Sequence, residues 1–131
     1  MKKRSYILLT LIICLMILIL PSCDPDTPVS PTINVKEPAE LSAASKLVEE
    51  ALLGNDATTL ISLLLPKYVP VYSEHIYNSI DVLSELGTAF KKRKLIALDR
   101  IYAVYQVEYG SSRYEISFSL DNEGYWKLTN F

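Results

Sequence analysis

The chain has 131 residues, enough for one domain of ordinary size. Residues 1–22 contain three basic and no acidic side chains, which leaves 10 basic and 15 acidic ones in residues 23–131 and a net charge of about −5. This acidic balance argues against nucleic acid as a partner. Two cysteines and one histidine are too few for an ordinary structural zinc site, so the sequence predicts no metal and no cofactor.

The N-terminal segment has the pattern of a secretory signal peptide. Lys2, Lys3 and Arg4 precede an apolar run over residues 6–20, interrupted only by Thr10. As a helix, this run would be about 22 Å long. A hydrocarbon core is about 30 Å thick, so the run is short for a membrane span and has the length of a signal-peptide core.

A cysteine follows directly after this run. Leu20-Pro21-Ser22-Cys23 resembles the lipobox of bacterial lipoproteins, with Leu at −3, a small residue at −1 and Cys at +1, although Pro21 is unusual at −2. The resemblance implies that residues 1–22 are a signal peptide cut between Ser22 and Cys23. It also implies that Cys23 carries the lipid, with palmitate-type acyl chains, and anchors the protein to the outer side of a bacterial membrane, in the cell envelope. The alternative is an uncleaved short anchor with an incidental cysteine.

The next segment is predicted to be a spacer. Residues 23–37 contain Pro25, Pro28 and Pro31, no glycine and almost no large apolar side chains. Such a composition favours a semi-extended tether. The sequence therefore predicts a lipidated cysteine with a proline-rich acidic tether over residues 23–37, followed by one domain over residues 38–131.

Helical periodicity fills the first half of that domain. A helix is expected to begin at residue 38 and to end at residues 54–55, and a short one capped by Asn55 or Asp56 then ends at Pro66. A third is expected to run from a Ser73 cap to Phe90. The apolar positions behind these predictions are Leu41, Ala44, Val48, Ala51, Leu52, Leu60, Ile61, Leu64, Ile76, Ile80, Leu83, Leu86 and Phe90.

The second half changes to the alternation typical of strands. Strands are expected over residues 95–98, 102–109, 114–120 and 125–131, separated by turns at residues 110–112 and 121–124. In residues 114–120, apolar and polar side chains alternate as in a half-buried antiparallel strand. Helices followed by a meander predict an α+β fold, with N-terminal helices packed on a curved antiparallel sheet.

Two stretches carry a weaker resemblance that covers residues 38–131. ALLGNDATTLISLL resembles the opening of nuclear-transport-factor-two-like domains, in which a helix, a small-residue break and a short helix follow one another. DNEGYWKLTNF is similar to their last hairpin, in which a glycine turn precedes a Trp-Lys-aliphatic strand. The resemblance implies a cone-shaped fold, and in enzymes of this fold acid–base groups lie inside the cone. Another cystatin-like arrangement remains open.

Aromatic side chains are concentrated on the predicted sheet. The chain has nine tyrosines and one tryptophan. The candidate contact face for a partner protein or a small apolar ligand consists of Tyr102, Tyr105, Tyr109, Tyr125 and Trp126, because tyrosine combines an apolar body with a polar tip. The alternative is that these residues serve cross-strand pairing and the core.

Few residues suggest catalysis. His75, Asp81 and Asp99 are candidate acid–base groups, but no Ser-His-Asp order and no HExxH helix is present. The sequence favours a non-enzymatic, membrane-anchored binding module. The alternative is a small acid–base enzyme, of the isomerase, dehydratase or cyclase type, with a cone cavity around His75. A cavity that holds His75 or Asp99 would favour the enzyme, and a filled cone would favour the interaction protein.

Overall fold

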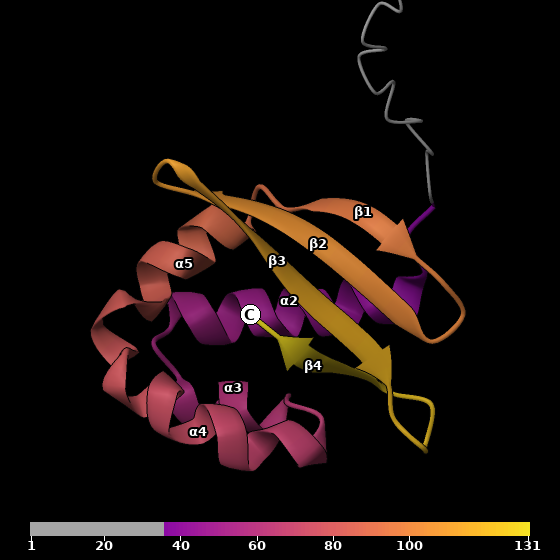
Figure 1. The fold of residues 1–131 in the computed structure, drawn as a ribbon, viewed down its shortest axis with the longest axis horizontal. Helices are drawn as coiled ribbons and strands as arrows, with labels where there is room; N and C mark the ends of the chain where they lie inside the picture. The colour runs from indigo at the N-terminus through magenta and orange to yellow at the C-terminus, as the bar shows by residue number, and fades with distance from the viewer. Residues whose placement is uncertain (1–35) are drawn as a thin grey trace, which may run out of the picture. The chain divides into compact units, whose positions relative to one another are not determined.

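The computed structural model describes residues 36–131; the predicted signal peptide, the lipobox and most of the tether lie outside this range. Helices come first and strands follow (Figure 1). The helices are α2 (Ala39–Leu53), α3 (Ala57–Ser62), α4 (Val69–Asn78) and α5 (Leu83–Phe90), with 3₁₀ turns η1 (Pro66–Tyr68) and η2 (Ile80–Val82). The strands are β1 (Lys94–Leu98), β2 (Tyr102–Tyr109), β3 (Ser112–Leu120) and β4 (Trp126–Asn130).

The four strands form one antiparallel sheet in the order β1-β2-β3-β4, which is open and not closed into a barrel. Figure 1 shows α2 running behind the strands, with α4 and α5 along one side of the sheet. The predicted α+β class, with helices followed by an antiparallel meander, is therefore confirmed. The strand boundaries differ from the expected ones by at most two residues.

The first helix is also confirmed, and the second forms but ends at Ser62, before the predicted end at Pro66. In α2, Leu41, Val48, Ala51 and Leu52 are buried, as the periodicity predicts. Asp56 caps α3, since its carboxylate accepts hydrogen bonds from the backbone N–H of Thr59 at 2.9 Å and from the Thr59 hydroxyl at 2.6 Å. These bonds hold the pKa of Asp56 below its ordinary value.

The prediction of a single third helix from Ser73 to Phe90 is wrong. The segment forms two helices, α4 and α5, joined by the turn η2. Ser73 is not a cap, because it lies inside α4 and donates a hydrogen bond to the carbonyl of Val69 at 2.6 Å. Pro70 begins α4 instead, and the backbone leaves the helical region at Ser79, where short polar side chains compete with helical hydrogen bonds.

The strand register brings the apolar residues to one inner face. Ala103 pairs with Phe118 and Tyr105 pairs with Ile116, and all four are at most 1% exposed. Phe118 also pairs with Leu128 of β4, so Ile116 and Phe118 face inward as predicted. Burial does not alternate over the whole of residues 114–120, because Ser117 is also buried and Tyr114 is 46% exposed. The outer edge of β4 is covered by residues 63–65: the Leu65 N–H donates to the Leu128 carbonyl at 2.8 Å.

Helices α5 and α2 approach each other closely at Gly87. A Cβ atom at this position of α5 would lie 2.8 Å from the backbone nitrogen of Leu53 and 3.0 Å from Cβ of Leu52. Only glycine therefore fits where α5 packs against the end of α2. This close approach fixes the middle of α5 against the end of α2.

Candidate functional site

A pocket of about 570 Å³ lies between the α4–η2–α5 segment and the inner face of the sheet. This volume is within the usual range of small-molecule sites. Its walls are predominantly apolar. The lining residues are Tyr72, His75, Ile76, Ser79, Val82, Leu83, Leu86, Tyr109, Tyr114, Ile116 and Phe131.

The break between α4 and α5 builds the helical wall of this pocket. Ile76 and Leu83 are 1% and 2% exposed and fix the two helices to the core on either side of the break. Between them, Val82 on η2 is 49% exposed although it lines the pocket. A continuous helix would have placed these positions on one straight stripe, so the break matters to the shape of the site.

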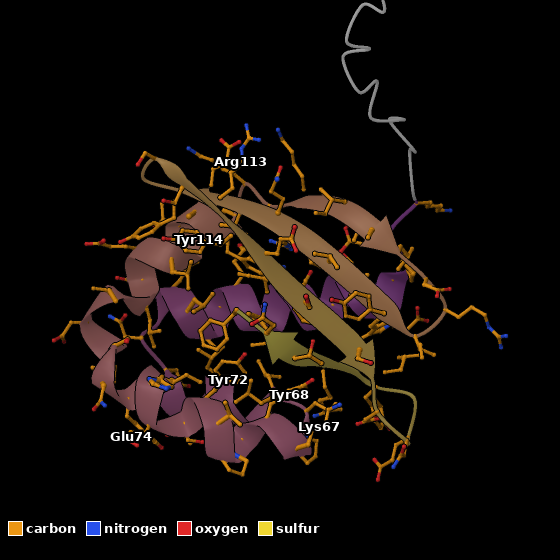
Figure 2. All side chains as sticks on the ribbon, in the orientation of Figure 1. Lys67, Tyr68, Tyr72, Glu74, Arg113 and Tyr114 are labelled. Atoms are coloured by element: carbon orange, nitrogen blue, oxygen red, sulfur yellow. The ribbon has the colours of Figure 1, made fainter. Side chains whose placement is uncertain are left out.

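The end of the β2–β3 hairpin builds the opposite wall. Tyr109 and Tyr114 lie on the inner face of adjacent strands, with ring centroids 6.4 Å apart, and Ile116 is buried beside them. Phe131 at the chain end packs against Tyr72 with centroids 5.7 Å apart. Figure 2 shows Tyr114 next to α5, and Tyr72 between α4 and the end of β4. Aromatic rings thus contribute to both walls.

Two of the tyrosine hydroxyls at the pocket already donate hydrogen bonds. Tyr72 donates to Oδ1 of Asn130 at 2.9 Å, and Tyr109 donates to Oε2 of Glu85 at 2.5 Å. The hydrogen bond to Glu85 raises the pKa of Tyr109, with smaller contributions from burial and from the charge of Glu85. Because each hydroxyl donates its one hydrogen in these bonds, its oxygen lone pairs remain available as acceptors.

The predicted acid–base groups are not brought together. His75 is exposed and lines the pocket, whereas Asp81 and Asp99 do not line it. Asp99 lies in the β1–β2 turn, where its carboxylate accepts from the Arg100 N–H at 2.6 Å. No carboxylate belongs to the pocket lining. Among residues 36–131, no cluster of three or more metal-ligating side chains is present.

The five aromatic residues predicted as one contact face lie in different environments, and the structure does not bring them together on one surface. Tyr105 is 1% exposed and belongs to the core. Tyr102 points to the outer face, since it precedes the inward-facing Ala103, and donates to the Ser117 hydroxyl at 2.9 Å. Trp126 is half-buried on the inner face of β4, and Tyr125 is 63% exposed in the preceding turn. Of the five, Tyr109 alone lines the pocket.

Sequence reasoning missed Tyr72 and Phe131 as site residues. Tyr72 lies before the predicted Ser73 cap, outside the predicted helices, and Phe131 stands at the last position of the predicted strand, so neither had a pattern that marks a site. Tyr114 stands on the apolar side of the predicted alternation in residues 114–120, which was a sequence signal for an inward-facing residue. The structure leaves it 46% exposed. Its role could not be inferred because the wall opposite it comes from distant residues in the sequence.

A buried polar cluster lies at the other end of β2. The Tyr105 hydroxyl donates to Oε1 of Glu37, and the guanidinium of Arg93 donates to Glu49 at 2.6 Å and to the Ser45 hydroxyl at 3.0 Å. Burial, followed by the hydrogen bond to Glu37, raises the pKa of Tyr105 far above its ordinary value. Glu37 was assigned to the tether, yet its contacts with Tyr105 and Ser45 make it part of the packed domain.

Comparisons with family models, with curated proteins and with solved structures find no match for this chain. Within residues 36–131, no helix is both long and apolar enough to cross a membrane. Ser22 and Cys23, the predicted cleavage and lipidation residues, lie outside the residues that the structure describes.

Proposed function

We propose that the protein is an exported, lipid-anchored, non-enzymatic module that binds a small, mainly apolar ligand in the pocket between α4, α5 and the sheet. The observation that carries the proposal is the pocket itself: about 570 Å³, lined mostly by aliphatic and aromatic side chains with a few polar groups. Ligand sites generally combine these features. A partner protein is the other occupant that the sequence suggested, and nucleic acid does not fit the acidic charge.

The pocket is open although its walls contain groups that could have filled it. Val82 and Tyr114 line it and are nevertheless 49% and 46% exposed. Exposed apolar surface that lines a concave site is available to a ligand without any rearrangement of the core. Binding would then bury this surface, which stabilises a complex by about 25 cal/mol for each Å² removed from water.

The test blocks the pocket at its most exposed aliphatic wall. Tryptophol, an uncharged indole alcohol, is equilibrated by dialysis with the full chain in phosphatidylcholine nanodiscs, and empty nanodiscs serve as the blank. Val82→Trp should abolish binding by filling the pocket. Val71→Trp is the matched control, because Val71 is 56% exposed on α4 and does not line the pocket. Equal binding to both variants, or none to the wild type, would refute the proposed site.

The anchor rests on the lipobox resemblance of residues 20–23. Stable anchoring needs more than one acyl chain, since each buried methylene contributes only about 0.8 kcal/mol, and a mature lipoprotein carries enough of them. We expect Cys23→Ser to move the protein out of the detergent phase in a partition experiment. If the variant still enters that phase with its apolar run intact, the run is an uncleaved anchor and the lipoprotein proposal fails.

We also propose that the domain is of the nuclear-transport-factor-two-like, or cystatin-like, type. The break at Gly54 between α2 and α3, and the Gly124 turn before the Trp126-Lys127-Leu128 strand, are the features behind this proposal. The described sheet has four strands and is open. An experimental structure whose sheet does not curve around the pocket would argue against this assignment.

A second candidate function is an acid–base enzyme, and the observation that favours it is that His75 lines the pocket. In this reading His75 would move a proton on a bound substrate. His75→Ala is the test, because an exposed residue can be replaced without loss of the fold. A binding module should keep both tryptophol binding and its cellular role. A variant that folds and binds normally but behaves in cells like a deletion would favour the enzyme.

A further inference from the structure

We propose that the pocket selects ligands whose polar end is an ammonium or hydroxyl group and rejects carboxylates of the same size. This inference rests on the proposed function and specifies the class of ligand. It is carried by the charges around the pocket and by the direction of its hydrogen bonds.

On the helical wall of the pocket, acidic side chains are present and lysine and arginine are absent. The α4–η2–α5 segment, residues 69–90, contains Glu74, Asp81 and Glu85 and neither lysine nor arginine. All three carboxylates are exposed, and Glu85 is held at the pocket by its bond to Tyr109. Figure 2 shows Glu74 directed away from the sheet, so it contributes only at longer range. A negative field over the entrance attracts cationic ligands and repels anionic ones.

The nearest strand end does not cancel this field. Arg113 lies on the outer face of β3, where its guanidinium pairs with Glu108 at 3.7 Å, and 72% of its side chain is exposed. In Figure 2 the Arg113 side chain points away from α5. Among residues 36–131, no lysine or arginine lines the pocket, so a bound carboxylate would find no permanent cation in contact with it. A carboxylate left unpaired against an apolar wall loses its hydration without compensation.

The hydrogen bonds have the complementary preference. A phenol hydroxyl can donate one hydrogen bond, and Tyr72 and Tyr109 donate theirs to Asn130 and Glu85. Their oxygens can then only accept hydrogen bonds from a ligand. The hydroxyls of Tyr114 and Ser79 can serve in either direction. Aromatic faces at the entrance add a favourable contact for a cation, of about 0.5–1 kcal/mol at exposed sites. A ligand that donates hydrogen bonds therefore fits the pocket better than one that only accepts them.

Three compounds that share an indole ring and differ in their polar end group test this selection: tryptamine, tryptophol and indole-3-propionate. Their affinities for the full chain in phosphatidylcholine nanodiscs are measured by equilibrium dialysis at pH 8, above the range in which histidine side chains generally carry charge. Tryptamine should bind at least as tightly as tryptophol, and indole-3-propionate should bind at least about fivefold more weakly. The preference for tryptamine should shrink with added salt.

Two matched variants place the effect at the pocket. Glu85→Gln removes a carboxylate and keeps an acceptor for Tyr109, and it should lower the tryptamine-to-tryptophol affinity ratio about two- to fivefold. Glu115→Gln removes an equal charge from the outer face of β3 and should leave that ratio unchanged. If tryptophol binds but indole-3-propionate binds equally well, or if Glu115→Gln acts like Glu85→Gln, this inference is wrong while the binding function stands. If no indole binds, both fail.

Discussion

The two ends of the inner face of β2 carry the same chemical pair in different settings. At the closed end, which comprises Glu37, Ser45, Glu49, Arg93 and Tyr105, a tyrosine donates to a glutamate within the packed interior. At the open end, which comprises Tyr72, Glu85, Tyr109 and Tyr114, a tyrosine donates to a glutamate in solvent beside a pocket. Both ends have a tyrosine–glutamate hydrogen bond, so the helices packed over it decide whether the bond belongs to the core or to a pocket.

The two ends differ in burial because different helices pack over them. The closed end lies under the long, uninterrupted α2, and Arg93 stacks on Phe90 with its guanidinium carbon 4.6 Å from the ring centroid. The open end faces α4 and α5, which are separated by η2 and cannot present a continuous apolar stripe. One strand thus supports a filled core and a ligand-sized hollow, because its two halves meet a continuous helix and a broken one.

The largest contrast between the two ends concerns Phe118 and Tyr114, four residues apart on β3. Phe118 is 1% exposed and packs edge-on against Tyr105, with ring centroids 5.7 Å apart. Phe118→Ala should lower the free energy of unfolding by about 3–5 kcal/mol, the usual range for buried aromatic residues. Trp126→Ala should cost less, because that ring is only half-buried. The measurement is denaturant unfolding monitored by circular dichroism.

Tyr114→Ala is the counterpart at the open end. Tyr114 is 46% exposed, so its removal should change stability little and should weaken tryptophol binding instead. If Tyr114→Ala destabilised the domain as much as Phe118→Ala, the open end would be part of the core and the comparison would fail.

A second contrast uses the two arginines that form ion pairs. Arg93 is 15% exposed in its side chain and bonds Glu49, Ser45 and the Phe90 carbonyl. Arg93→Met keeps most of the apolar volume and removes these bonds, and it should cost about 1.5–3 kcal/mol of unfolding free energy. Arg113→Met is the matched control, since its pair with Glu108 is exposed and such pairs contribute little. Equal losses in urea unfolding would show that the closed end is not specially stabilised.

The closed end was more predictable from sequence than the open end. The stripe of Leu41, Val48 and Leu52 is a local pattern, and all three residues are buried. The apolar positions Ile116 and Phe118 are buried as their alternation predicts, although Ser117 between them is buried too. The break at Ser79 was missed because the apolar stripe from Ile76 to Phe90 continues through it. Local periodicity does not register a change in helix direction when the spacing of apolar residues is preserved.

The candidate site was predicted only in fragments. His75 and Tyr109 were named in advance, but they belong to different hypotheses and no local pattern places them in one pocket. Tyr105 and Tyr109 have the same residue type and lie on the same face of one strand, and only the tertiary cover separates a core residue from a pocket residue. Long-range packing of this kind leaves no signal in a single sequence.

Loss of the hydroxyl should affect the stability at one of these two tyrosines and not at the other. Tyr105→Phe removes the donor to the partly buried carboxylate of Glu37 and should cost about 0.5–1.5 kcal/mol of unfolding free energy near neutral pH. Tyr109→Phe removes a solvent-exposed bond and should leave the free energy of unfolding unchanged within error. Its effect should appear in tryptophol affinity, because the pocket loses one acceptor.

Alkaline pH separates the same two residues by a different route. The pKa of Tyr105 is raised in the folded state, mainly by burial, whereas an unfolded tyrosine ionises near pH 10. Above about pH 10 the unfolded chain therefore releases the Tyr105 proton while the folded chain retains it, and the free energy of unfolding falls as the pH rises. Tyr105→Phe removes this contribution and should lose less stability between about pH 9 and 11 than the wild type, in urea unfolding at each pH.

The pKa of Tyr109 is raised by an exposed hydrogen bond, so Tyr109→Phe should follow the wild-type pH profile closely. Indistinguishable profiles for Tyr105→Phe and the wild type would mean that the Tyr105 hydroxyl reaches solvent and that the closed end is not closed.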